Sequence, residues 1–149
     1  MKKLALVTAL ALTALITAPA QAATSSGTFN VNIALTSACV YSKTADVTFA
    51  YTSFQGAAST ATSGGFTLQC TNTLPYTLAL DATSITDTAT NLAYTVALSA
   101  SSGTGTGVAQ TYSVTGSMAS GQAGTCATAG GACTNTASTN KVRTLTITY

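Results

Sequence analysis

Residues 27–39 read GTFNVNIALTSAC and alternate apolar with polar side chains close to the start of the chain. Such alternation is typical of a β-strand with one face in an apolar environment. The apolar face carries Phe29, Val31, Ile33 and Leu35, and the other face carries Asn30, Asn32, Ala34 and Thr36. Because a strand needs a neighbour for its backbone N–H and C=O groups, the first question is what this segment pairs with.

The segment follows a stretch typical of an export signal. Residues 1–22 read MKKLALVTALALTALITAPAQA, with a basic start at Lys2 and Lys3, an apolar run, and Ala20-Gln21-Ala22 at the end. The apolar run is too short, and its flanks are wrong, for a membrane span. We predict a signal peptide (1–22) cleaved after Ala22, export through the periplasm, and one domain in the remaining chain.

The charge of the exported part argues against several partners. Without Lys2 and Lys3, the net charge is 3 − 3 = 0. The three positive side chains are Lys43, Lys141 and Arg143, and the three negative ones are Asp46, Asp81 and Asp87. Nucleic acids and anionic membranes are bound by clustered Lys and Arg. We therefore expect neither as a partner.

The four cysteines predict disulfides, because an even number in an exported chain usually pairs. Four cysteines allow three connectivities. We favour Cys39–Cys70 and Cys126–Cys133, since Ala129-Gly130-Gly131 can turn the chain between the last two. A metal site is disfavoured because the spacings are not CxxC and the chain has no histidine.

The composition predicts an all-β fold. Segments rich in Thr, Val, Ile and Tyr alternate with segments rich in Gly, Ser and Asn. Expected strands are 28–36, 45–52, 64–72, 75–82, 92–100, 108–118 and 141–149, with loops at 59–65, 99–109 and 119–140. About seven short strands predict a β-sandwich.

The chain lacks the residues that most enzymes use. It contains no His, Glu or Trp, and its three aspartates are scattered. General acid–base and nucleophilic catalysis need a His or a tuned carboxylate beside a partner. We expect no enzymatic activity, no cofactor, no metal and no small-molecule substrate, and we assign Asp81 and Asp87 to turns or loops.

The two ends of the chain suggest how the first strand is paired. The last expected strand runs to Tyr149, which leaves no further segment to cover its edge, whereas residues 28–36 are an additional strand before Cys39. Each subunit could give its N-terminal strand to the next, and such a head-to-tail exchange does not close and builds a filament. The alternative is that 28–36 form the first strand of a complete sandwich.

Three segments resemble a known family: GTFNVNIALTSACVYS (27–42), GGFTLQCTNTLPYTLALD (64–81) and RTLTITY (143–149). They are similar to the small pilin subunits of archaic chaperone–usher pili, the spore coat U domain family. Two features depart from the family pattern. Phe49-Ala50 stands where members often carry Phe-Gly, and the pair Cys126/Cys133 lies outside the pattern.

The resemblance implies an incomplete immunoglobulin-like sandwich without its final strand. Its implied donor side chains are Phe29, Val31, Ile33 and Leu35. A periplasmic chaperone would grip the last strand, through Leu145, Ile147 and Tyr149, before an outer-membrane usher exchanges it for the next subunit's donor. The expected domains are an extension (23–36) and a pilin sandwich (37–149).

The expected function is that of a structural subunit of a surface pilus, a homopolymer that serves adhesion and biofilm formation. The alternative is a monomeric, secreted or coat-associated β-sandwich that binds a ligand.

Overall fold

The computed structural model describes residues 22–149, which are almost entirely β-structure and loops. The elements are β1 Cys39–Ala45, β2 Ser59–Thr60, β3 Gly64–Cys70, β4 Pro75–Leu80, β5 Ser84–Thr86, β6 Ala93–Leu98, β7 Ser102–Thr104, β8 Gln110–Met118, the 3-10 turn η1 Asn135–Ala137, and β9 Leu145–Thr148. Within these residues no helix is long and apolar enough to cross a membrane.

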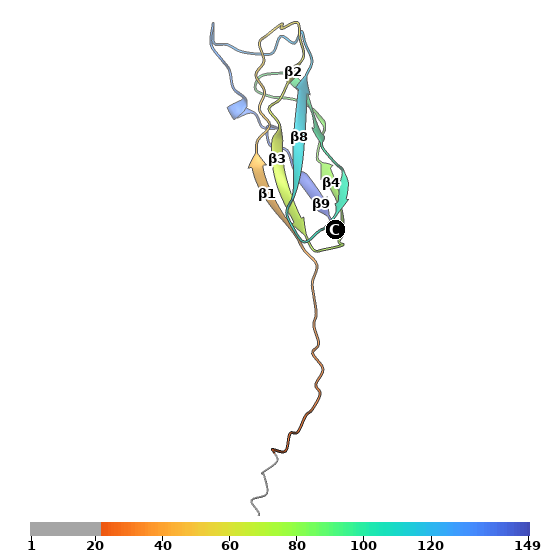
Figure 1. Cartoon of the computed structure of the whole chain (residues 1–149). Coiled ribbons are helices and arrows are strands. Elements are labelled where there is room, and N and C mark those ends of the chain that lie inside the picture. Colours follow the sequence, from red (N-terminus) through yellow and green to blue (C-terminus); the bar gives the residue numbers. More distant parts are fainter. Residues whose placement is uncertain (1–21) are drawn as a thin grey trace, which may run out of the picture. The chain divides into compact units, whose positions relative to one another are not determined.

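The strands form two antiparallel sheets, as expected for an all-β sandwich. One sheet has the order β1-β3-β8-β6-β5, with β2 also paired to β8, and the other has the order β7-β4-β9. Figure 1 shows β1, β3 and β8 side by side, with β4 and β9 in the second layer. Strand β9 ends at the end of the sandwich where β1 begins.

The core lies between the two sheets because one face of each central strand is apolar. In β3, Phe66, Leu68 and Cys70 are buried, and in β4 Tyr76 and Leu78 are buried. Side chains of β6, β8 and β9 pack against this cluster from neighbouring positions: Leu98, Tyr112, Val114, Leu145 and Ile147. The period of two in the sequence therefore predicted the buried faces of β3 and β4 correctly.

The turn from β3 to β4 is tightly packed at the end of the sandwich where Cys39 lies. Thr73 adopts a left-handed backbone conformation, with φ 64°. The backbone of Gly105 lies so close that a Cβ there would stand 2.1 Å from the Thr71 carbonyl oxygen. Only glycine fits position 105, because any larger residue would push this turn away from its neighbour.

Several predicted strand boundaries are wrong. Residues 46–52 form only an isolated bridge, Thr48 with Thr62, although Val47, Phe49 and Tyr51 are alternately half-buried as expected. The first strand, β1, lies in a segment where no strand was expected, and the loop at 99–109 contains β7. The last strand begins at Leu145 instead of 141.

Residues 22–38 contain no strand, so the strand expected at 28–36 is not formed in the single chain. An isolated extended segment leaves its backbone groups without partners, and a lone strand is therefore not a stable element. The chain divides into two units, Met1–Ala34 and Leu35–Tyr149. The first strand of the sandwich is β1, and 28–36 is not part of the sheets.

Candidate subunit interface

Strand β9 has one unpaired edge among the described residues. It pairs with β4 alone, from Leu80 opposite Leu145 to Thr77 opposite Thr148. The Asp81 N–H donates to the Thr144 carbonyl at 3.0 Å. This bond shows which residues of β9 direct their backbone groups toward β4. Because bonding directions alternate in an antiparallel pair, Leu145 and Ile147 turn their backbone N–H and C=O groups toward the unpaired edge.

The side chains of β9 are only partly covered. Leu145 and Ile147 pack against the core but stay half-exposed, and Thr146 and Thr148 are exposed. Tyr149 follows the strand and is 58% exposed. An apolar inner face that remains partly exposed at a sheet edge is a place where a further strand would fit.

Strand β1 forms the corresponding edge of the other sheet. It pairs with β3 alone, with Tyr41 opposite Leu68 and Lys43 opposite Phe66. Directly opposite residues share a face, so Tyr41 and Lys43 lie on the inner face. Yet Tyr41 is 47% exposed, whereas Leu68 is 0% exposed. Burial therefore falls sharply from β3 to β1, and among residues 22–149 the inner face of β1 is only partly covered beyond Cys39.

Aromatic contacts and an ion pair define the chemistry of this inner face. The Tyr41 ring lies 5.5 Å from the Phe66 ring, centroid to centroid. Lys43 Nζ forms an ion pair with Asp46 Oδ1 at 2.9 Å, and both side chains are exposed. The face is thus apolar near Cys39 and charged toward the end of β1. We call the unpaired edges of β1 and β9, with these inner side chains, the open edge.

A disulfide fixes β1 at its start. Cys39 and Cys70 are directly opposite residues of the β1–β3 ladder and are bonded to each other. The second disulfide joins Cys126 to Cys133 in the exposed loop before β9. Both pairs are those favoured from the sequence. The first cross-links an edge strand to the core strand beside it, and the second closes a small loop.

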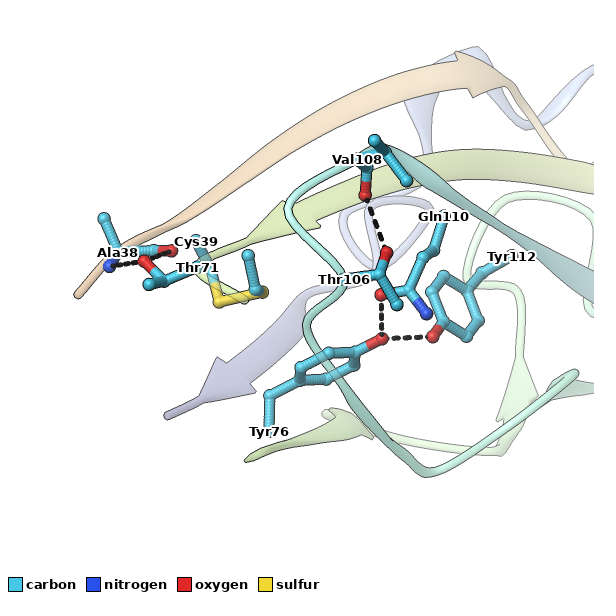
Figure 2. The surroundings of a disulfide bond; sticks show 9 residues. Ala38, Cys39, Thr71, Tyr76, Thr106, Val108, Gln110 and Tyr112 are labelled. Atoms are coloured by element: carbon cyan, nitrogen blue, oxygen red, sulfur yellow. Dashed lines mark hydrogen bonds between the residues drawn. A yellow bond between two sulfur atoms is a disulfide. The ribbon is translucent and has the colours of Figure 1, made fainter. Parts of the chain in front are cut away.

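Beside the first disulfide, Tyr76 and Tyr112 share a hydrogen bond between their hydroxyls, and Tyr76 also contacts Gln110 Oε1 at 3.1 Å (Figure 2). Burial, together with the bond to Tyr112, raises the pKa of Tyr76 to about 12. This hydroxyl stays protonated in neutral solution and acts as a structural link between β4 and β8.

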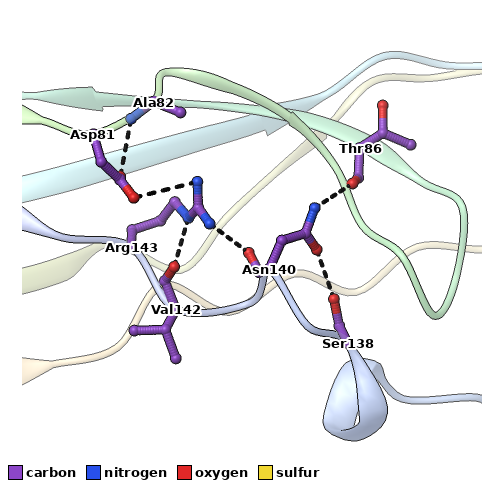
Figure 3. A network of polar contacts seen from close by, with 7 residues as sticks. All are labelled: Asp81, Ala82, Thr86, Ser138, Asn140, Val142 and Arg143. Atoms are coloured by element: carbon purple, nitrogen blue, oxygen red, sulfur yellow. Dashed lines mark hydrogen bonds and ion pairs between the residues drawn. The ribbon is translucent and has the colours of Figure 1, made fainter.

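The start of β9 is held by a polar network (Figure 3). Arg143 forms an ion pair with Asp81 Oδ2 at 3.5 Å and donates to the Asn140 carbonyl at 2.8 Å. The Asn140 amide donates to the Thr86 carbonyl at 2.7 Å. The network anchors residues 140–143 to the turn after β4 and to β5, so the position of the open edge depends on it. Asp81 thus has the turn role expected from the sequence.

The expected donor side chains are strongly exposed. Phe29, Val31, Ile33 and Leu35 are between 72% and 86% exposed. Contiguous apolar exposure of this kind is typical of interaction surfaces. Sequence analysis predicted that these four residues and the β9 residues contact other subunits, and this stays a prediction. It did not predict that Tyr41 lies at an open sheet edge, because β1 shows no apolar alternation after Cys39.

The two antiparallel sheets place the chain among the all-β sandwich proteins. The Spore Coat Protein U domain model matches residues 25–103, just over half of the chain. The chain therefore belongs to this family, the family of archaic chaperone–usher pilus subunits. Searches of the curated proteins and of the solved structures found no match.

Proposed function

We propose that the chain is a pilin, a structural subunit that polymerises when its extension (23–36) fills the open edge of the next subunit. One observation carries the proposal. The same chain presents an unpaired β9 edge with half-exposed Leu145 and Ile147 and a separate, exposed apolar segment with strand periodicity. Strand addition to a sheet edge supplies main-chain hydrogen bonds, and alternate side chains fill the inner face.

The energetics favour the exchange. Burying four apolar side chains stabilises the joint by about 6–12 kcal/mol, at roughly 1.5–3 kcal/mol each, before the entropy of ordering the segment is subtracted. The backbone ladder contributes about 0.5–1.5 kcal/mol for each hydrogen bond. A joint of this size dissociates slowly, as a filament exposed to shear requires.

The direction of the donated strand decides what assembly forms. Strand β9 ends at the end of the sandwich where Cys39 begins β1. A donated strand antiparallel to β9 ends at the other end of the acceptor sandwich, and its own subunit follows there. Neighbouring subunits are then joined through unlike ends, which builds an open filament. A donor parallel to β9 would join like ends and would close into a pair. We propose the antiparallel direction.

The assembly machinery follows from the family. We propose that residues 1–22 direct export to the periplasm and are removed after Ala22. A chaperone then covers the open edge through Leu145, Ile147 and Tyr149, and an outer-membrane usher exchanges it for the next subunit's extension. The resulting surface homopolymer serves adhesion and biofilm formation.

The proposal is tested by a charge placed on the donor face. Ile33→Asp, and separately Val31→Asp, should abolish filaments, because a carboxylate cannot be buried unpaired. The matched control is Asn32→Asp, which adds the same charge to the opposite face and should leave filaments intact. The readout is electron microscopy of sheared surface material, with immunoblots for periplasmic subunit. Normal filament yield from both Val31→Asp and Ile33→Asp would refute the donor assignment.

A further inference from the structure

Each subunit carries both a donor segment and an open edge, so a subunit that closed on itself would never polymerise. We propose that Thr71 and Ala38 prevent this closure by holding the chain before β1 in a conformation that cannot turn back. The inference rests on the proposed function.

Thr71 holds Ala38 through three hydrogen bonds (Figure 2). The Ala38 N–H donates to Thr71 Oγ1 at 3.0 Å. The Ala38 carbonyl accepts from the Thr71 N–H at 3.0 Å and from the Thr71 hydroxyl at 3.3 Å. The β1–β3 ladder is thereby extended one residue beyond the disulfide, with a side chain serving in place of a backbone group.

The Thr71 hydroxyl takes the place that the Thr71 carbonyl would have in a regular ladder. That carbonyl accepts instead from the Leu74 N–H at 3.1 Å within the turn to β4. The turn is itself held by bonds between Thr73 N–H and the Gly105 carbonyl, and between Gly105 N–H and the Leu74 carbonyl, both 2.8 Å. The hydroxyl is therefore the acceptor for Ala38, and its position is fixed.

The register of a closing strand makes this contact decisive. A strand that turned back before Cys39 would run antiparallel to β1, where directly opposite residues share a face. A two-residue turn places Ala34 or Thr36 opposite Cys39 and directs the Asn-rich face inward. A three-residue turn over 36–38 places Leu35 opposite Cys39 and Ile33 opposite Tyr41. The three-residue turn is thus the shortest that directs the apolar face inward.

Ala38 opposes that turn in two ways. The common three-residue hairpin ends in a left-handed residue, for which glycine is preferred. Here that residue is Ala38, and it is not among the described residues with positive φ. Turning it would also break its bonds to Thr71. Closure on the same subunit therefore costs both a conformational strain and three hydrogen bonds, whereas donation to a neighbour costs neither.

The test is refolding of the full exported chain with its disulfides intact. Wild type, Thr71→Val, Ala38→Gly and the double variant are diluted from denaturant at low concentration, and monomers are isolated by size exclusion. Chymotrypsin cleavage after Phe29 and Leu35 then reports whether the extension is protected. The matched control is Thr67→Val in β3, whose hydroxyl makes no side-chain hydrogen bond within the described part of the chain.

Thr71→Val removes the two hydrogen bonds of the hydroxyl. We expect it to raise the protected monomer fraction about thirtyfold, the factor set by two hydrogen bonds of about 1 kcal/mol each. The protected monomer fraction should be higher still in the double variant, and in Thr67→Val it should equal that of wild type. A double variant with no more protected monomer than wild type would overturn the inference, as would an already protected wild-type monomer. Because this assay needs no filaments, its failure is distinguishable from failure of the donor-face test.

Discussion

At the scale of single residues, Asp87 shows how a buried carboxylate can stabilise a loop. It is 3% exposed, and its Oδ1 accepts from the Ala89 N–H at 3.0 Å, the Thr90 N–H at 2.7 Å and the Thr90 hydroxyl at 2.8 Å. Burial alone would raise the pKa of Asp87. The nearby Ser138 hydroxyl and the donors of Thr90 and Ala89 outweigh it and hold the pKa below its ordinary value.

A lowered pKa means that the charged form stabilises the folded state. This contribution is complete above the unfolded pKa of about 3.9 and is lost as the pH falls through the lower, folded pKa. We expect Asp87→Asn to reduce the free energy of unfolding at neutral pH by about 1–3 kcal/mol. The difference from wild type should shrink in acid. Denaturant unfolding between pH 2 and pH 7, roughly the span of this titration, measures it.

The control for this prediction is Asp46→Asn, because Asp46 is exposed and paired only with Lys43 on the surface. Exposed ion pairs contribute about 0–1 kcal/mol. A difference between Asp87→Asn and wild type that is constant across this pH range would show that the carboxylate charge has no such role.

At the scale of elements, the sequence predicts strands well where one face is buried. Phe66 and Leu68 in β3, and Tyr76 and Leu78 in β4, alternate with less buried residues because each strand packs this face against the opposite sheet. It predicts β1 poorly because the inner face of that strand is only partly covered, so nothing requires Lys43 to be apolar. Residues 45–52 were expected as a strand because Val47, Phe49 and Tyr51 alternate with other residues. In the structure Phe49 packs on Tyr94, at 5.4 Å between ring centroids, but the segment has only an isolated bridge.

The site shows the same division between local pattern and long-range pairing. The expectation of a donor segment came from an alternation that is complete within 28–36, and it stays a prediction. The role of Arg143 in anchoring β9 was not predictable, because its partners Asp81 and Asn140 are brought together only by the fold. Thr71 was missed for a similar reason, since its contact with Ala38 spans 33 positions.

The disulfide of β1 gives a prediction at this scale. Cys39 and Cys70 are 31 positions apart, and Cys126 and Cys133 are 7 apart. Loop-closure entropy grows with loop length, so the first bond should contribute about 3–4 kcal/mol and the second about 2–2.5 kcal/mol. The double variant Cys39→Ser/Cys70→Ser should therefore release the edge strand β1 and sharply lower the amount of subunit in the periplasm.

The paired control is Cys126→Ser/Cys133→Ser, which opens only the exposed loop. Limited proteolysis of periplasmic extracts measures both variants beside wild type. We expect rapid loss of the first variant and near-normal survival of the second. Equal sensitivity of the two variants would contradict the assignment of β1 as an edge that depends on its cross-link.

At the scale of the whole molecule, the described chain carries few charges, and they balance. Residues 22–149 contain Lys43, Lys141 and Arg143 against three aspartates. Of these, Lys43 pairs with Asp46 and Arg143 pairs with Asp81 within the subunit. The extension (23–36) has no charged side chain at all. A joint made by this extension is therefore apolar and hydrogen-bonded, without ion pairs contributed by the donor.

An uncharged joint should be insensitive to salt, because screening weakens only interactions between charges. We expect filaments to keep the same length distribution from about 10 mM to 1 M ionic strength, over which the Debye length falls from roughly 30 Å to 3 Å. Dynamic light scattering and electron microscopy of purified filaments measure this. Donor-face variants Ile33→Val and Ile33→Ala should instead shorten filaments in proportion to the apolar area removed, at any salt concentration. Filaments that dissociate at high salt would mean that charged side chains such as Lys43, and not the apolar donor face, hold neighbouring subunits together.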